Sequence, residues 1–466
     1  MYLRETYMYQ IDFSKPCHVH FIGIGGISMS GLAEILITAG FKVSGSDAHE
    51  SELTDHLANM GAEISIGQRA ENIGQPDVVV YTAAIRPDNP EYAEAVRKGI
   101  PMMPRADLLG ELMLNYRQSV NVSGTHGKTT TTSMITEILL AAEADPTVTV
   151  GGILDSIGGN IRVGGPDVFV AEACEYTNSF LSFFPTVSIV LNVEADHLDF
   201  FKDIDDIRNS FRKFIMRLPQ DEKGFLIING RIKDLDFFTD GLGCSYVTYG
   251  IGDGFDYCAK DISFNETAQP EYTLVVNGEE CGRIALGVRG EHNVENSLAA
   301  IAAADRLGID RSFTVSALKA FTGTRRRFEY KGSCNGFTVI DDYAHHPQEI
   351  TATLKAALMY PHKKLVVAFQ PHTYSRTAAL LPEFAKALSA ADRVILADIY
   401  AAREKNTYGI SSEDLGREII RLGTEADYFG SFDEIRKNIL ETLEPGDLLI
   451  TMGAGNIVDI GNQLVQ

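Results

Sequence analysis

The sequence predicts an α/β protein of three domains, in which mostly parallel sheets are covered by helices. Short apolar runs alternate with amphipathic segments along almost the whole chain, which is typical of this fold class. Glycine-bearing turns follow apolar runs near residues 23 and 124 and lead into helical stretches, and the alternating pattern restarts near residue 323. A length of 466 residues also favours about three domains. The predicted domains are residues 1–117, 118–322 and 323–466.

The apolar runs give the expected elements of each domain. In the first domain we expect a helix over 30–39 and strands over 18–22, 41–44 and 77–81. In the second we expect a helix over 133–142 and strands over 120–122, 168–171, 187–191 and 225–228. The stretch 249–280 is rich in turn residues, so we expect strands and loops there. Strands of the third domain are expected over 338–340, 365–369, 394–397 and 448–451.

The composition narrows the class of protein. A formal net charge of -22 argues against an extended nucleic-acid surface, because binding a phosphate backbone requires a basic field. A local basic cleft for a nucleotide is compatible with that charge. The six cysteines are scattered without the short spacings of a zinc or redox motif, which favours reduced thiols in the cytoplasm. No secretory signal opens the sequence, and no apolar run reaches the ~18 residues of a membrane span.

A phosphate-binding loop is predicted at Gly124-Thr125-His126-Gly127-Lys128-Thr129-Thr130. Its spacing is shorter than the G-x-x-x-x-G-K-[ST] pattern, yet a strand still leads through glycines to a helix start, where backbone N–H groups can face an anion. Lys128 adds a positive charge and Thr129 offers a hydroxyl to Mg²⁺. An ordinary strand-to-helix turn capped by threonines is the alternative. We favour ATP as the ligand.

A second glycine turn, with Gly23, Gly25 and Gly26, resembles a dinucleotide fingerprint, and Asp47 lies where a ribose-binding acid is expected. Ser28 occupies the place of the last glycine of that fingerprint. The turn therefore predicts a diphosphate site, for NAD or for a sugar nucleotide, and a turn needed only for packing is the alternative.

Two further predicted strands end at acidic residues. Glu172 closes one, and Asp196-His197 follows another. Ends of parallel strands meet at one sheet edge, so Glu172 is expected near the phosphate loop as a ligand of a hard cation. From spacing alone, His197 is better explained as a core or helix-start histidine.

The third domain carries three polar sets. Arg325-Arg326-Arg327 lies at the predicted boundary, as a solvated linker or as a phosphate-reaching hinge. Asp341-Asp342-Tyr343-Ala344-His345-His346-Pro347 and Gln370-Pro371-His372 each follow a strand, which suggests a binding edge. Zinc-site spacing and a serine-hydrolase elbow are both absent from the sequence.

Together these motifs resemble the Mur ligase family over nearly the whole chain after about residue 16. The resemblance is carried by HFIGIGGISMSGLAEIL, GTHGKTTTT, NVEADHLD, GEHNVENSLAA, GTRRRFE, DDYAHHP, QPHTYSRT and GAGNI, all in the family's order. It implies a Rossmann-like N-terminal domain for a UDP-sugar, a P-loop-type central ATPase domain and a Rossmann-like C-terminal domain for an amino acid. The Gly23 turn is then assigned to the UDP-sugar rather than to NAD.

The resemblance further implies an ATP- and Mg²⁺-dependent ligase of peptidoglycan synthesis in the cytoplasm. It would join L-alanine to the lactyl carboxylate of UDP-N-acetylmuramate through an acyl phosphate, as a monomer or homodimer. The alternatives are a sister ligase that adds a recycled peptide or another amino acid, an NAD-dependent oxidoreductase, and a regulator that binds nucleotide without turnover. The oxidoreductase leaves Lys128 and the acidic strand ends unexplained.

The same resemblance assigns roles residue by residue. Lys128 would stabilise the phosphates and the acyl phosphate, and Thr129, Glu172 and His197 would position Mg²⁺, which reverses the reading of His197 from spacing. The predicted adenine, phosphate and ribose contacts are His292, Asn293, Asn296, Arg326 and Asp341. The predicted alanine-end residues are Tyr343, His345, His372 and Arg376. Cys174 stands where the family often has an acid, so no metal role is assigned to it.

Overall fold

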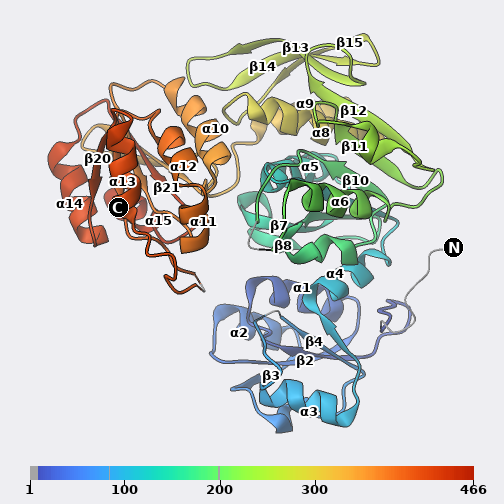
Figure 1. The fold of residues 1–466 in the computed structure, drawn as a ribbon. Coiled ribbons are helices and arrows are strands. Elements are labelled where there is room, and N and C mark those ends of the chain that lie inside the picture. Colours follow the sequence, from blue (N-terminus) through green and yellow to red (C-terminus); the bar gives the residue numbers. More distant parts are fainter. Residues whose placement is uncertain (1–8, 83, 198–199, 403) are drawn as a thin grey trace. The chain divides into compact units, whose positions relative to one another are not determined.

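The computed structural model describes residues 9–82, 84–197, 200–402 and 404–466. The chain forms two compact units. One holds residues 1–128, 142–151 and 159–247, and the other holds 129–141, 152–158 and 248–466. Figure 1 follows the chain through three separate groups of strands, which confirms the predicted α/β class and three-domain architecture.

The N-terminal sheet has the strand order β3-β2-β1-β4-β5, and all its pairs are parallel. Its strands are β1 (His18–Ile22), β2 (Lys42–Asp47), β3 (Glu63–Ile66), β4 (Val78–Tyr81) and β5 (Met102–Pro104). Its helices are α1 (Ile27–Thr38), α2 (Glu52–Asn59), α3 (Pro90–Lys98), α4 (Arg105–Met113) and the 3₁₀ turn η1 (Ala70–Ile73). Helix α1 begins three residues earlier than predicted, directly after extended Gly26.

The central sheet of the first unit has the order β11-β10-β6-β9-β7-β8. Its strands are β6 (Gln118–Ser123), β7 (Thr147–Leu154), β8 (Gly159–Arg162), β9 (Val168–Ala173), β10 (Val187–Val190) and β11 (Phe225–Asn229). The helical elements along this part of the chain are α5 (Lys128–Ala141), η2 (Asp155–Ile157), η3 (Tyr176–Ser182), α6 (Ile204–Ile215) and α7 (Asp236–Thr239). Strand β6 pairs in parallel with β9 and β10, so the phosphate loop leaves from the middle of the sheet.

Four strands follow the central sheet, as the turn-rich composition predicted. They are β12 (Ser245–Ile251), β13 (Tyr257–Phe264), β14 (Pro270–Val276) and β15 (Glu279–Ala285). Pairs β13–β14 and β14–β15 are antiparallel. Two helices complete this segment, α8 (His292–Arg306) and α9 (Arg311–Ala320).

The C-terminal sheet has the order β16-β17-β21-β18-β19-β20, parallel except for β16. Its strands are β16 (Glu329–Cys334), β17 (Phe337–Asp342), β18 (Leu365–Phe369), β19 (Arg393–Leu396), β20 (Glu425–Tyr428) and β21 (Leu448–Met452). Its helices are α10 (Pro347–Leu358), α11 (Tyr374–Ala379), α12 (Leu381–Leu388), α13 (Ser412–Arg421), α14 (Phe432–Thr442) and α15 (Val458–Leu464). Strands β18 and β21 are buried along their whole length, because helices cover both faces of a parallel sheet.

The sequence pattern missed or shifted some elements. Helix α5 starts at Lys128, five residues before the predicted helix, because threonines and a lysine form its first turn in place of an apolar stripe. The short strands β3, β5, β8, β16 and β20 were not predicted. Their residues are mostly only partly buried, which leaves a weak apolar signal. The longer strand β7 was also not predicted, because threonines and glycines interrupt its apolar residues.

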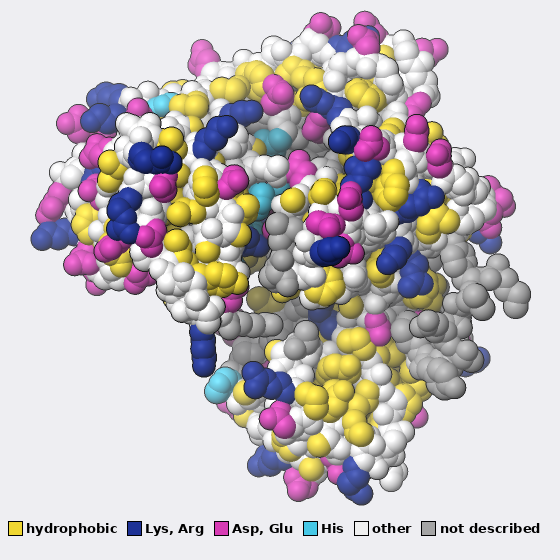
Figure 2. Space-filling model, in the orientation of Figure 1, with side chains coloured by type: hydrophobic (Ala, Val, Ile, Leu, Met, Phe, Trp, Pro, Cys, Tyr) yellow, Lys and Arg dark blue, Asp and Glu magenta, His cyan; other side chains and the backbone are white. Residues whose placement is uncertain are grey.

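The surface agrees with the acidic composition. Figure 2 shows acidic and basic side chains interspersed over the visible face, without a basic stripe. Across the described part of the chain, no helix has the length and apolar character needed to cross a membrane.

Candidate active site

The loop between β6 and α5 has the backbone that anion binding requires. Gly124 has φ +146° and Gly127 has φ +85°, conformations that favour glycine. A Cβ at Gly124 would lie 2.9 Å from Cβ of Leu191 on the chain leaving β10. Helix α5 begins at Lys128, so its N-terminal amides and the lysine ammonium are adjacent.

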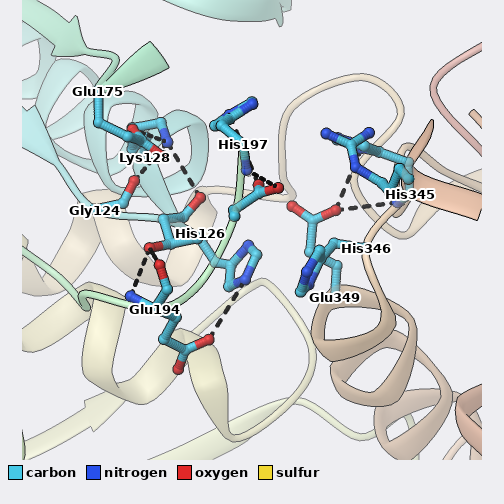
Figure 3. Close-up of polar contacts among 12 residues, drawn as sticks. Gly124, His126, Lys128, Glu175, Glu194, His197, His345, His346 and Glu349 are labelled. Atoms are coloured by element: carbon cyan, nitrogen blue, oxygen red, sulfur yellow. Dashed lines mark hydrogen bonds and ion pairs between the residues drawn. The ribbon is translucent and has the colours of Figure 1, made fainter. Parts of the chain in front are cut away.

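Lys128 is held inside this loop (Figure 3). Its Nζ donates to the carbonyl oxygens of Gly124 and Thr125, and lies 3.0 Å from Oε2 of Glu175. Burial opposes its charge, but the carboxylate of Glu175 and further acidic groups outweigh burial and keep the pKa of Lys128 above its usual range. The other carboxylate oxygen of Glu175 is buried and has no hydrogen-bond partner among the described residues. The ammonium is therefore charged and is held in place by two carbonyl oxygens and one carboxylate.

The chain leaving β10 holds the loop from the other side. Asn192 accepts a hydrogen bond from the backbone N–H of His126 at 2.8 Å and donates to the His126 carbonyl at 3.1 Å. The hydroxyl of Thr125 accepts from the N–H of Glu194 at 3.0 Å, and the imidazole of His126 lies 3.6 Å from the Glu194 carboxylate (Figure 3). These contacts fix the loop before any ligand arrives.

The predicted metal ligands come from three segments. Glu172 accepts a hydrogen bond from the Gly151 amide, and the ring of His197, which has φ 53°, lies tilted against that of Tyr176 at 4.5 Å between centroids. Thr129 is buried in the first turn of α5, and Thr130 follows it there. No group of three or more His, Cys, Asp or Glu among the described residues could hold a metal by itself. Leu198 and Asp199 of the NVEADHLD motif lie outside the described residues.

The Gly23 turn leaves β1 at the carboxyl edge of the N-terminal sheet. The N–H of Gly25 donates to Asp47 at 2.8 Å, and a Cβ there would lie 2.9 Å from the same carboxylate oxygen. Asp47 therefore stabilises the turn by this hydrogen bond. The predicted ribose contact would be an additional role of the same side chain. Gly26 and Ser28 are exposed beside it.

The predicted adenine residues cluster at the start of α8. Asn296 donates to Asn293 at 2.9 Å, and Asn293 donates to the carbonyl of Arg289 at 2.7 Å. His292 is exposed at the first position of α8, whereas Asn293 and Asn296 are buried. The two amides offer both donors and acceptors, which suit an uncharged base.

Arg326 is tied into the C-terminal sheet rather than exposed as a linker. Its guanidinium lies 3.0 Å from Asp341 and donates to the carbonyls of Gly453 and Gly455 at 2.6 and 3.1 Å. Asp341 is fully buried, and its other oxygen accepts from Thr451. Both residues thus stand in an ordered pair, and their proposed nucleotide contacts would replace or extend it.

The predicted alanine-end residues meet at the exits of β17 and β18. Ring centroids of Tyr343 and His345 are 5.4 Å apart, and those of His345 and His372 are 5.8 Å apart. Arg376 lies 3.4 Å from Nδ1 of His372. Burial lowers the pKa of His345 to about 4 despite Glu349 at 3.3 Å (Figure 3), so its imidazole is neutral near pH 7. Arg376 remains the charged group of this set.

Sequence reasoning singled out no role for Asn192 and Glu194, and left that of Glu175 open. Asn192 and Glu194 follow a predicted strand, as Glu172 does, so their position at the sheet edge was a usable signal. Which of these side chains braces the loop depends on backbone contacts across strands, and spacing does not carry that information.

Three family profiles cover most of the chain. Residues 18–117 match "Mur ligase family, catalytic domain", 122–304 match "Mur ligase middle domain", and 326–455 match "Mur ligase, glutamate ligase domain". The chain is 58% identical to the UDP-N-acetylmuramate–L-alanine ligase of Lachnospira eligens, over 98% of this chain and 100% of that protein.

Two solved structures are similar over nearly their full length. The UDP-N-acetylmuramate-alanine ligase MurC of Thermotoga maritima has TM-score 0.78 and 32% identity, over 96% of this chain and 98% of that one. A murein peptide ligase of Psychrobacter arcticus has TM-score 0.68 and 26% identity, over 96% and 98% of the two chains. The phosphate loop, its acidic neighbours and these matches lead to one conclusion: the chain belongs to the Mur ligase family.

Proposed function

We propose that the protein joins L-alanine to the lactyl carboxylate of UDP-N-acetylmuramate, with ATP as the energy source, in peptidoglycan precursor synthesis. A carboxylate oxygen attacks the γ-phosphorus of ATP, and the bond to ADP breaks to leave an acyl phosphate. The amino nitrogen of alanine then attacks the acyl carbon, loses a proton, and inorganic phosphate departs. We place the reaction in the cytoplasm, where ATP is available, with the enzyme as a monomer or homodimer.

The observation that carries the proposal is the half-buried Lys128 ammonium, which is held within a glycine loop 3.0 Å from Glu175. Acyl transfer through an acyl phosphate needs alignment and charge neutralisation rather than a covalent enzyme nucleophile. Lys128 and the α5 amides neutralise the transferred phosphoryl group, while Asn192 keeps the loop from moving. Arg376 would hold the alanine carboxylate, because a guanidinium pairs with a carboxylate through two parallel hydrogen bonds.

The donor set fits a Mg²⁺ ion whose coordination shell is completed by oxygen atoms of the substrates. Mg²⁺ is usually held by one or two carboxylates plus phosphate oxygens and water, so a site lacking a three-residue protein cluster is the expected kind. Glu172, Thr129 and His197 would hold it, directly or through water. When bound, the ion supplies neutralisation of the phosphate charge.

The test measures phosphate release with ATP, Mg²⁺ and UDP-N-acetylmuramate while the acceptor is varied among L-alanine, L-serine, glycine and the peptide L-Ala-γ-D-Glu-diaminopimelate. Strong stimulation by L-alanine is expected. If no single amino acid stimulates release, the proposal is wrong.

A peptide ligase is the second candidate, because the Psychrobacter arcticus structure shares this architecture over almost the whole chain. Stimulation by the peptide in the absence of stimulation by L-alanine would favour it. The higher identity to proteins named for L-alanine supports the first candidate.

A further inference from the structure

An arginine outside the described site stands without a partner at the edge of the first unit. Arg105 is the first residue of α4, directly after β5, and it is half-buried. It makes no hydrogen bond or ion pair with any residue in the described ranges. Other half-buried arginines have a carboxylate partner: Arg326 lies 3.0 Å from Asp341, and the Arg311 guanidinium lies 2.7 Å from Asp305.

The position of Arg105 opposes helix stability. A cation in the first turn lies at the positive end of the helix dipole, where carboxylates are favoured. The N-cap residue, Pro104, offers no side-chain acceptor to the free amides of α4. Asp107, the acid of that turn, accepts a hydrogen bond from the Ser182 hydroxyl at 2.6 Å. The first turn of α4 therefore holds an arginine that has no ion-pair partner among the described residues, and its amides have no side-chain cap.

The packing of α4 places Arg105 close to the segment that carries Glu172 and Glu175. Ser182 belongs to η3, the turn that follows Glu172 and Glu175, and a Cβ on Gly110 of α4 would lie 2.0 Å from the Ser182 carbonyl oxygen. Helix α4 thus touches η3 backbone to backbone. The electrostatic neighbour of Arg105 is Cys174, the residue before the carboxylate that holds Lys128. Burial away from any acid lowers the pKa of the guanidinium, as expected for a charge awaiting an anion.

The same residue also lies at the carboxyl edge of the N-terminal sheet. Strand β5 is next to β4, which is next to β1, whose exit is the Gly23 turn. Arg105 thus lies at the same sheet edge as the Gly23 turn. It is also close to the end of β9, which is followed by Glu175, the partner of Lys128. A sugar nucleotide with its diphosphate on the turn and its carboxylate toward Lys128 would pass this point.

We propose that Arg105 binds the lactyl carboxylate of the sugar nucleotide and aligns it for attack on the γ-phosphorus. This assignment rests on the proposed function and adds a substrate-binding residue to it. A bidentate guanidinium contact leaves the carboxylate planar and oriented, and its charge continues to stabilise the acyl phosphate that forms. The substrate's lactyl carboxylate thus supplies the ion-pair partner that Arg105 lacks among the described residues.

The experiment compares the wild-type enzyme with Arg105→Ala, Arg105→Lys and the control Arg117→Ala. Arg117 is exposed and lies at the opposite, amino end of β6. Calorimetry measures binding of UDP-N-acetylmuramate and of UDP-N-acetylglucosamine, which lacks the lactyl carboxylate, and kinetics measure KM for ATP. For Arg105→Ala we expect about ten- to one-hundred-fold weaker binding of the first ligand, since a charged hydrogen-bonded contact is lost.

Binding of UDP-N-acetylglucosamine and the KM for ATP should stay unchanged in Arg105→Ala, and Arg105→Lys should recover part of the loss. Equal weakening of both sugar nucleotides would assign Arg105 to the diphosphate and overturn the carboxylate contact. Unchanged binding of UDP-N-acetylmuramate would overturn the proposal altogether. If the wild-type enzyme shows no L-alanine-dependent turnover, the proposed function itself fails, and that result is separable from the behaviour of the variants.

Discussion

At the scale of single residues, two half-buried cations among the predicted site residues are each held by one carboxylate. Lys128 has Glu175, Arg326 has Asp341, and each pair is partly desolvated. A buried ion pair contributes little net stability, but breaking it leaves a costly isolated charge. Each carboxylate therefore fixes the position of its cation, and Lys128 and Arg326 are the cations that we predict to contact phosphate.

Replacing Lys128 tests the phosphate loop. Lys128→Ala should reduce kcat/KM by at least about a thousandfold, because the main neutralising charge on the transferred group is lost. Calorimetric binding of UDP-N-acetylmuramate should persist. The variant also strands the Glu175 carboxylate, so the double variant Lys128→Met/Glu175→Gln, which removes both charges, should fold and remain inactive. Lys223→Ala, at an exposed site, is the control. Retained turnover in the double variant would contradict the assignment.

Replacing Asn192 tests whether the β10 exit positions the loop. Asn192→Ala removes both hydrogen bonds to the backbone of His126, so we expect KM for ATP to rise by about tenfold, the equivalent of about 1.4 kcal/mol. KM for UDP-N-acetylmuramate should change little. Asn229→Ala is the control, because Asn229 ends the neighbouring strand β11 and its side chain accepts a hydrogen bond from the amide of Arg231 rather than from the loop. Equal effects of both substitutions would reduce Asn192 to a packing role.

At the scale of elements, parallel strands deliver the functional groups to shared sheet edges. The glycine loop follows β6, Glu172 lies at the end of β9, and Asn192 follows β10. These three strands are adjacent in the sheet. Sequence predicted each of these exits, because an apolar run followed by polar residues marks a strand end in parallel sheets. It did not predict the lateral packing of α4 on η3, since glycine at position 110 gives no periodic signal.

Gly110 sets that packing. Alanine normally stabilises a helix interior by about 1 kcal/mol relative to glycine. At Gly110 the added Cβ would meet the Ser182 carbonyl oxygen at 2.0 Å, so Gly110→Ala should lower the melting temperature by several degrees and raise KM for UDP-N-acetylmuramate. Gly416→Ala in α13 is the control, because its nearest neighbour is the flexible Leu396 Cδ1 at 3.3 Å. A melting temperature equal to that of the wild type would show that α4 does not pack on η3 this closely.

At the scale of the whole molecule, the free energy of unfolding depends on pH through every group whose pKa differs between the folded and unfolded states. The pKa of His345 is lowered to about 4 by burial, below the ~6.5 of an unfolded chain, so the unfolded state binds more protons between these values. Its contribution to stability is fully present above pH ~6.5 and is lost as the pH falls toward 4.

Denaturant unfolding at pH 7 and pH 5 checks this contribution. Acidification to pH 5 should cost the wild-type protein on the order of 2 kcal/mol through His345, in addition to other groups. In His345→Gln, which cannot titrate, the loss between the two pH values should be smaller by that amount. An unchanged difference would mean that His345 is not desolvated in the folded protein.

The sequence alone determined the fold class, the three-part alternation and most strand exits, and it predicted the phosphate loop, because hydrophobic period and glycine turns are local properties of the chain. The short edge strands could not be predicted from the sequence, because few of their side chains are buried. Only the tertiary structure decided which groups hold one another: Glu175 on Lys128, Asn192 on His126, Asp47 on Gly25, and nothing in the described protein on Arg105. Those pairings depend on distances between segments that are remote along the chain, and burial and charge there follow from packing rather than from residue order.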